Sequence, residues 1–95
     1  MTHQNKNLDK ARAELGDIDQ ELIDLLNRRF SLIRQIGAIK KTNGIAIEQR
    51  DYWQQKSMEL SSKSEEMGIN QAFFEEVYSL IHEESIRIQK SLIED

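Results

Sequence analysis

The chain has 95 residues, of which 38% are hydrophobic and 32% charged, and its formal net charge is −4. This length fits one domain, near the lower limit at which a single core is stable. The negative charge argues against a nucleic-acid binder, and the lack of cysteine excludes disulfides, thiolate metal sites and thiol nucleophiles.

The first predicted helix runs from about Leu8 to Thr42. Its apolar residues recur at the three- and four-residue spacing of one helix face. They stand at positions 8, 15, 18, 22, 25, 26, 33, 36 and 39. Asn43 and Gly44 end this helix, because both residue types accept the left-handed conformation found just past a helix C-terminus.

Two further helices follow, so the fold class is all-α with three helices per chain. The second is predicted from near Glu48 to about Glu66, and the residues 67–70 form a break. Asn70 is a suitable N-cap for the third helix. The inner face of that helix is expected to consist of Phe74, Val77, Tyr78, Ile81, Ile88 and Leu92.

The length of the first helix predicts a dimer. Thirty-five helical residues span roughly 50 Å, whereas a compact monomer of this size has a radius of gyration of about 12 Å. The apolar periodicity passes through Gly16 and Gly37 without changing phase. We therefore expect the stripe to be buried against a second copy of the chain, in a homodimer.

The predicted organisation is a single domain over residues 1–95, in which residues 1–7 form a flexible N-terminus. The chain begins with a polar segment and contains no apolar run approaching about 18 residues, so a cytoplasmic, membrane-free protein is expected.

Two cations lie where a core would normally hold leucine. Arg29 and Lys40 fall on the apolar stripe of the first helix, and Arg12 lies near its edge. Burying an unpaired cation costs several kcal/mol, so each needs an anionic partner. Internal salt bridges or snorkelling of the side chains to solvent would satisfy them. The acids considered as partners are Asp19, Glu83 and Glu84.

A pocket for a ligand with more than one carboxylate explains two cations on one stripe better than isolated salt bridges do. Ser85 and Gln89 stand on the third helix, four residues apart and on one flank. Either residue alone is compatible with a structural or surface role, since a serine hydroxyl can bond its own backbone. Together they are candidate neutral hydrogen-bonding members of the same site.

The spacing Arg12…Asp19…Arg29…Gly37-x-x-Lys40, followed by a second helix and by ESIRIQ, resembles the all-helical AroQ class of chorismate mutases. The segments LLNRRFSLIRQIGAIKK and IHEESIRIQ are close to the usual sequence of that family, and the likeness runs from Leu8 to about Leu92. The resemblance implies an intertwined homodimer of three-helix chains whose long first helices pair.

The resemblance also implies an activity, the rearrangement of chorismate to prephenate in aromatic amino-acid biosynthesis, with no cofactor and no metal. Arg29 would hold a substrate carboxylate, and Arg12 would reach the same ligand from the partner subunit. Lys40 and Gln89 would hydrogen-bond the ether oxygen of the breaking bond, and Ser85 would touch the ring carboxylate.

The second helix departs from the family pattern. In an ungapped register, Tyr52 and Trp53 occupy the positions of the family's arginine and adjoining glutamate, and Gln49 occupies that of an aspartate. Arg50 lies about 200° from Tyr52 around a regular helix, so it replaces the arginine only if the helix starts later or shifts. Trp53 is also suited to core or dimer packing. His82 has no second ligand at metal spacing and is assigned no role.

These departures keep two alternatives open. One is a related enzyme that rearranges 4-amino-4-deoxychorismate or eliminates pyruvate from isochorismate. The other is a weakly active module that binds a ligand or a partner protein. A plain helical dimerisation domain is less favoured, because it leaves inward-facing cations without a ligand.

Overall fold

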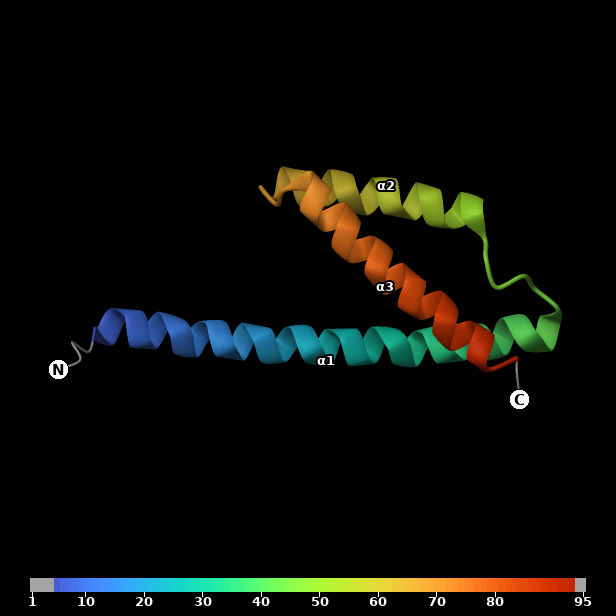
Figure 1. The fold of residues 1–95 in the computed structure, drawn as a ribbon, viewed down its shortest axis with the longest axis horizontal. Coiled ribbons are helices and arrows are strands. Elements are labelled where there is room, and N and C mark those ends of the chain that lie inside the picture. Colours follow the sequence, from blue (N-terminus) through green and yellow to red (C-terminus); the bar gives the residue numbers. More distant parts are fainter. Residues whose placement is uncertain (1–4, 94–95) are drawn as a thin grey trace. The chain divides into compact units, whose positions relative to one another are not determined.

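The computed structural model describes residues 5–93, and these form three α-helices and no β-strand (Figure 1). Helix α1 spans Lys6–Asn43, α2 spans Arg50–Glu66 and α3 spans Gln71–Ser91. The all-α class, the number of helices and the long first helix are therefore confirmed.

The helices of residues 5–93 include none with the length and apolar character needed to cross a membrane. The predicted flexible N-terminus falls partly outside the described residues. Where it is described, Lys6 and Asn7 already belong to α1.

Asparagine side chains begin the first and third helices. Asn5 Oδ1 accepts a hydrogen bond from the backbone N–H of Leu8 at 3.1 Å, so α1 starts two residues earlier than its apolar pattern predicts. Asn70 Oδ1 accepts one from the N–H of Phe73 at 2.8 Å, as the sequence predicts for α3. Each contact satisfies a donor that a helix start otherwise leaves without an intrahelical partner.

Helix α2 begins at Arg50, and the predicted start near Glu48 is wrong by two residues. Gln49 has a non-helical backbone (φ −118°, ψ 82°), and its side chain makes no capping bond. Just before it, the carbonyl of Ile47 accepts a hydrogen bond of 2.7 Å from Lys40 Nζ. This contact holds the connection between α1 and α2 against the lysine, and the first helical turn follows only after it.

Glycine ends α1 and α2 in the same way. Gly44 (φ 64°) and Gly68 (φ 82°) both have positive φ, a conformation that side chains with a Cβ rarely adopt. After Gly44, the N–H of Ile45 donates a hydrogen bond to the carbonyl of Lys40 at 2.8 Å. After Gly68, the N–H of Ile69 donates one to the carbonyl of Ser64 at 3.0 Å. Both are Schellman motifs, and both predicted breaks are confirmed.

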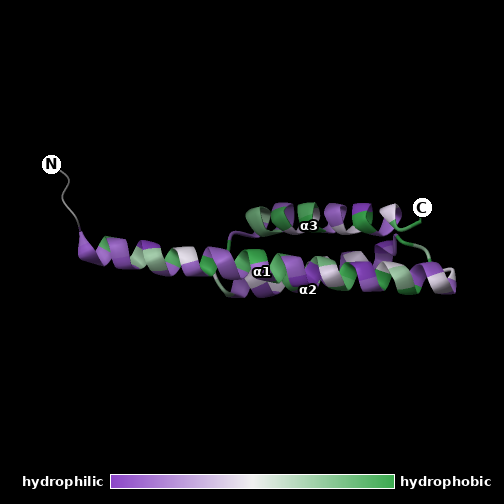
Figure 2. Ribbon diagram, turned by 90° about the horizontal axis from the view of Figure 1, so that it is seen from below, coloured by the Kyte–Doolittle hydropathy of each residue, from purple (hydrophilic) through white to green (hydrophobic). Residues whose placement is uncertain are grey.

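The chain divides into two compact units, and the boundary falls inside α1 between Leu32 and Ile33. In the first unit, residues from Lys6 onward form one helix along which hydrophobic and hydrophilic residues alternate (Figure 2). The exposed large hydrophobic side chains among them are between 38% and 60% exposed: Leu8, Leu15, Ile18, Leu22, Ile23, Leu25, Leu26 and Leu32. A single domain over the whole chain stays a prediction.

The second unit contains the end of α1 together with α2 and α3, which pack side by side (Figure 1). All six residues predicted for the inner face of α3 are buried or half-buried. Of the described residues, Tyr78 and Ile88 are the buried large apolar ones, at 8% and 7% exposure. Four polar residues are buried with them: Ser61, Ser64, Ser85 and Gln89.

Candidate active site

Lys40 connects three segments of the second unit. From the last turn of α1, its Nζ donates to the side-chain oxygen Oε1 of Gln89 on α3 at 2.8 Å and to the carbonyl of Ile47 at 2.7 Å. The side chain is half-buried, and desolvation lowers the pKa of its ammonium below the ordinary value of 10.5. Within residues 5–93, the partners of this cation are neutral oxygens rather than acidic side chains.

Gln89 and Ser85 are held by their own helix. Gln89 is 4% exposed and donates from Nε2 to the carbonyl of Ser85 at 3.3 Å. Ser85 is 2% exposed and donates from Oγ to the carbonyl of Ile81 at 2.8 Å. These bonds fix the two side chains on the face of α3 that meets Lys40.

Gly37 allows α1 and α3 to approach closely at this point. A Cβ added to Gly37 would lie 2.8 Å from Cδ1 of Leu92 and 3.1 Å from Cγ of Gln89, both tighter than normal van der Waals contact. One helical turn separates Gly37 from Lys40. The glycine therefore sets the distance at which the lysine meets the amide.

The Lys40–Gln89 pair retains donor capacity. An ammonium has three N–H bonds and a carboxamide nitrogen has two. Within the described part of the chain, Lys40 uses two of its three, and Gln89 uses one of its two. One proton on each group can still be donated to an acceptor atom of a ligand.

A hollow of about 250 Å³ opens between the start of α2 and the middle of α3. The residues that line it are Glu48, Gln49, Arg50, Trp53, Gln54 and His82. The rings of Trp53 and His82 are in contact, with centroids 4.5 Å apart. The Trp53 Nε1–H group is buried and has no hydrogen-bond partner within residues 5–93.

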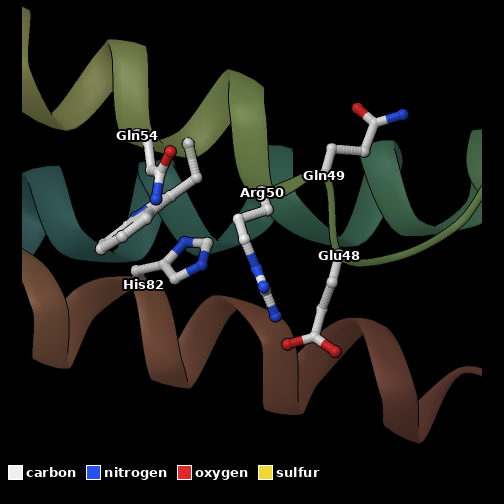
Figure 3. A pocket seen from close by; sticks show the side chains of 6 residues that line it. Glu48, Gln49, Arg50, Gln54 and His82 are labelled. Atoms are coloured by element: carbon white, nitrogen blue, oxygen red, sulfur yellow. The ribbon is translucent and has the colours of Figure 1, made fainter.

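Arg50 and His82 extend into the same space from opposite helices (Figure 3). Arg50 is the first residue of α2 and lines the hollow, and its role in place of an arginine at position 52 stays a prediction. In the same view, the side chain of Gln49 points away from His82. Tyr52 is 68% exposed and is not among the residues that line the hollow.

The structure thus brings together Lys40, Ser85 and Gln89, and places Arg50 and Trp53 at the adjacent hollow. Arg12 and Arg29 belong to the first unit, where Arg12 is exposed and Arg29 is half-buried. Their roles stay predictions. Sequence reasoning missed His82, although its position seven residues before Gln89 placed it on the same helical face.

Glu83 and Glu84, two of the acids considered as partners for the inward cations, are not bonded to Lys40. Glu84 forms a two-pronged exposed ion pair with Arg87, at 2.6 and 2.7 Å. The hydrogen bond from Arg87 lowers the pKa of the Glu84 carboxyl. Among residues 5–93, no group of three or more His, Asp or Glu side chains is arranged to hold a metal ion.

The three helices, the lysine–amide pair and the hollow next to them define an all-helical protein with a candidate site in the second unit. A family model described as chorismate mutase type II matches residues 11–90, and the chain belongs to this family. No curated protein matches the chain, and no solved structure does.

Proposed function

We propose that the protein is a chorismate mutase that converts chorismate to prephenate, an intramolecular step of aromatic amino-acid biosynthesis. Family membership supports a mutase-type activity. The observation that carries the specific proposal is the bond from Lys40 Nζ to Gln89 Oε1, at 2.8 Å in a partly desolvated setting. It places a cation beside the amide of Gln89, and each of the two groups keeps one N–H that an ether oxygen could accept.

The proposed reaction is an intramolecular rearrangement, so the protein supplies no nucleophile, acid or base. As the ether C–O bond breaks, a C–C bond forms within the same molecule, and no proton or external reactant takes part. Two contributions lower the barrier: confinement of the flexible enolpyruvyl chain in its reactive conformation, and stabilisation of negative charge developing on the ether oxygen. Lys40 and Gln89 are suited to the second, because each has one N–H left to donate.

The other predicted residues complete this proposal. Arg29 would hold a substrate carboxylate, since a guanidinium can donate two parallel hydrogen bonds to it. Ser85 would touch the ring carboxylate after its hydroxyl turns from the carbonyl of Ile81. Arg12 would reach the substrate from a second subunit.

A homodimer is part of the proposal. The apolar residues of α1 that the first unit leaves exposed continue into the second unit with Ile36 and Ile39, at 41% and 56% exposure. Among residues 5–93, Tyr78 and Ile88 are the buried large apolar side chains, a small core for a chain of this length. A second copy offers the same stripe, and pairing two such stripes removes apolar surface from water at about 25 cal/mol per Å².

A second candidate function rests on α2. Tyr52 is exposed, and Trp53 places an aromatic ring on His82 where the family pattern has an acid. These differences from the family pattern alter the residues that α2 offers to a substrate. They favour a related substrate, either 4-amino-4-deoxychorismate or isochorismate. A module that binds such a ligand without turnover is the third reading.

Loss of the ultraviolet absorbance of chorismate, with prephenate identified as the product, tests the first proposal. Turnover of the amino analogue, or release of pyruvate from isochorismate, with chorismate left unchanged, would replace it with the second. Binding of chorismate without any product would leave the third.

A further inference from the structure

The hollow beside α2 continues the face of α3 that holds the candidate site. His82, Ser85 and Gln89 follow one another at spacings of three and four residues, which places them on one side of a helix. On the opposite wall, Glu48 directly follows Ile47, whose carbonyl binds Lys40. The hollow and the Lys40–Gln89 pair are thus linked through one face of α3 and through the segment that carries Ile47 and Glu48.

The start of α2 presents positive charge to the hollow. Arg50 carries a permanent positive charge and points toward α3 (Figure 3). It stands at the N-terminus of α2, where the helix dipole adds partial positive charge and where Gln49 provides no side-chain cap. Glu48 also lines the hollow; its carboxylate lies 4.0 Å from Lys90 Nζ, and the end of the Arg50 side chain points toward it (Figure 3).

His82 adds a ring nitrogen to this arrangement. Its imidazole lies against Trp53 and extends into the space that the guanidinium of Arg50 enters (Figure 3). A neutral imidazole donates one hydrogen bond and an imidazolium donates two. An arginine and a histidine on facing helices can thus donate to the two oxygens of one carboxylate.

We propose that His82 and Arg50 together bind one carboxylate of the substrate in this hollow. The first turn of α2 and the middle of α3 then each contribute one residue that binds the carboxylate, and Tyr52 does not contact it. The identity of the ligand rests on the proposed function, whereas the place where its carboxylate binds does not.

Trp53 provides a direct readout, because it is the only tryptophan of the chain and lines the hollow. Its fluorescence, excited at the red edge of its absorption, is followed while chorismate, isochorismate or prephenate is added. Each is a dicarboxylate. We expect at least one of them to change the emission in a saturable way, and the titration gives its Kd.

Charge-matched variants separate binding in the hollow from general electrostatics. Arg50→Gln should raise the Kd about 10- to 100-fold, the range expected for a lost charged hydrogen bond. Lys56→Gln removes the same charge from the same helix, at a residue that pairs with Glu59 outside the hollow. It should leave the Kd unchanged.

His82 is tested by a substitution that keeps its packing. His82→Phe preserves an aromatic ring against Trp53 but removes both nitrogens, and should raise the Kd about 3- to 10-fold. In turnover assays, both hollow variants should raise KM with little change in kcat, because the contact is made equally in the ground state and the transition state. Circular dichroism melts show whether each variant is folded.

The outcomes separate this inference from the proposed function. Turnover of chorismate with equal Kd values for Arg50→Gln and Lys56→Gln overturns the inference and leaves the mutase proposal standing. A Kd raised by both Arg50→Gln and His82→Phe, without prephenate formation, overturns the mutase proposal and supports the inference. If none of the three dicarboxylates alters Trp53 emission, or if His82→Phe binds like the wild type, the inference is wrong.

Discussion

Lys40 and Gln89, 49 residues apart in the chain, are joined by a 2.8 Å hydrogen bond from the ammonium to the amide oxygen. The lysine also donates to Ile47, and the glutamine nitrogen donates to its own helix. The chain's own hydrogen bonds therefore orient the pair. Preorganised donors lower a barrier more than mobile ones do, because they need little reorganisation during the reaction.

Lys40→Ala should lower kcat about 10²- to 10³-fold, the range measured when one preorganised donor to a developing oxyanion is removed. Lys41→Ala is the matched control, since the neighbouring Nζ donates to the carbonyl of Leu92 and is exposed. Steady-state assays give kcat for each variant, and denaturant melts give its free energy of unfolding. Ile36→Ala should show the reverse pattern, with a larger loss of stability than of rate. Wild-type turnover in Lys40→Ala would disprove the role of the lysine.

The rate should depend on the protonation of Lys40. Burial lowers its pKa below 10.5, and only the protonated form stabilises charge on an ether oxygen. Activity is therefore present at neutral pH and is lost as pH rises through this lowered pKa, so kcat/KM should fall with a midpoint below 10.5. Lys40→Arg should remove this alkaline limb, because a guanidinium stays protonated there. An unchanged limb in that variant would assign the titration to another group.

Gly37→Ala should damage the site through packing. The new Cβ would meet Leu92 at 2.8 Å and Gln89 at 3.1 Å, so α3 must shift or the side chains must leave their rotamers. Overpacking of this kind costs about 1–3 kcal/mol of unfolding free energy, and displacing Gln89 should also lower kcat. Gly16→Ala is the control, because a Cβ there has no neighbour within 4 Å and alanine favours the helix. Equal melting temperatures for both variants would contradict this account.

Complementation in trans tests whether Arg12 acts across subunits. Arg12→Ala and Lys40→Ala chains should each be nearly inactive alone. After mixed refolding, half of the dimers are mixed and each has one intact site of two, so about a quarter of wild-type activity should return. Light scattering establishes the mass of the species. A monomer, or mixtures no more active than the single variants, would exclude a shared site.

The local elements of the fold could be predicted from the sequence. Gly44 and Gly68 end their helices because positive φ is a property of the residue itself, and Asn70 caps α3 through a bond within three residues. Residue type and helical spacing also mark Lys40 and Gln89 as candidate site residues, and the resemblance to the AroQ class implies that they act on the same atom.

Only the tertiary structure decided how α2 begins. Lys40 binds the carbonyl of Ile47, and the helix starts three residues later at Arg50, which the apolar pattern alone placed inside a regular turn. The same arrangement gives His82 a tryptophan neighbour and an arginine facing it. Periodicity along one helix carries no information about which residues of another helix it meets. Contacts between segments far apart in the chain supply that information.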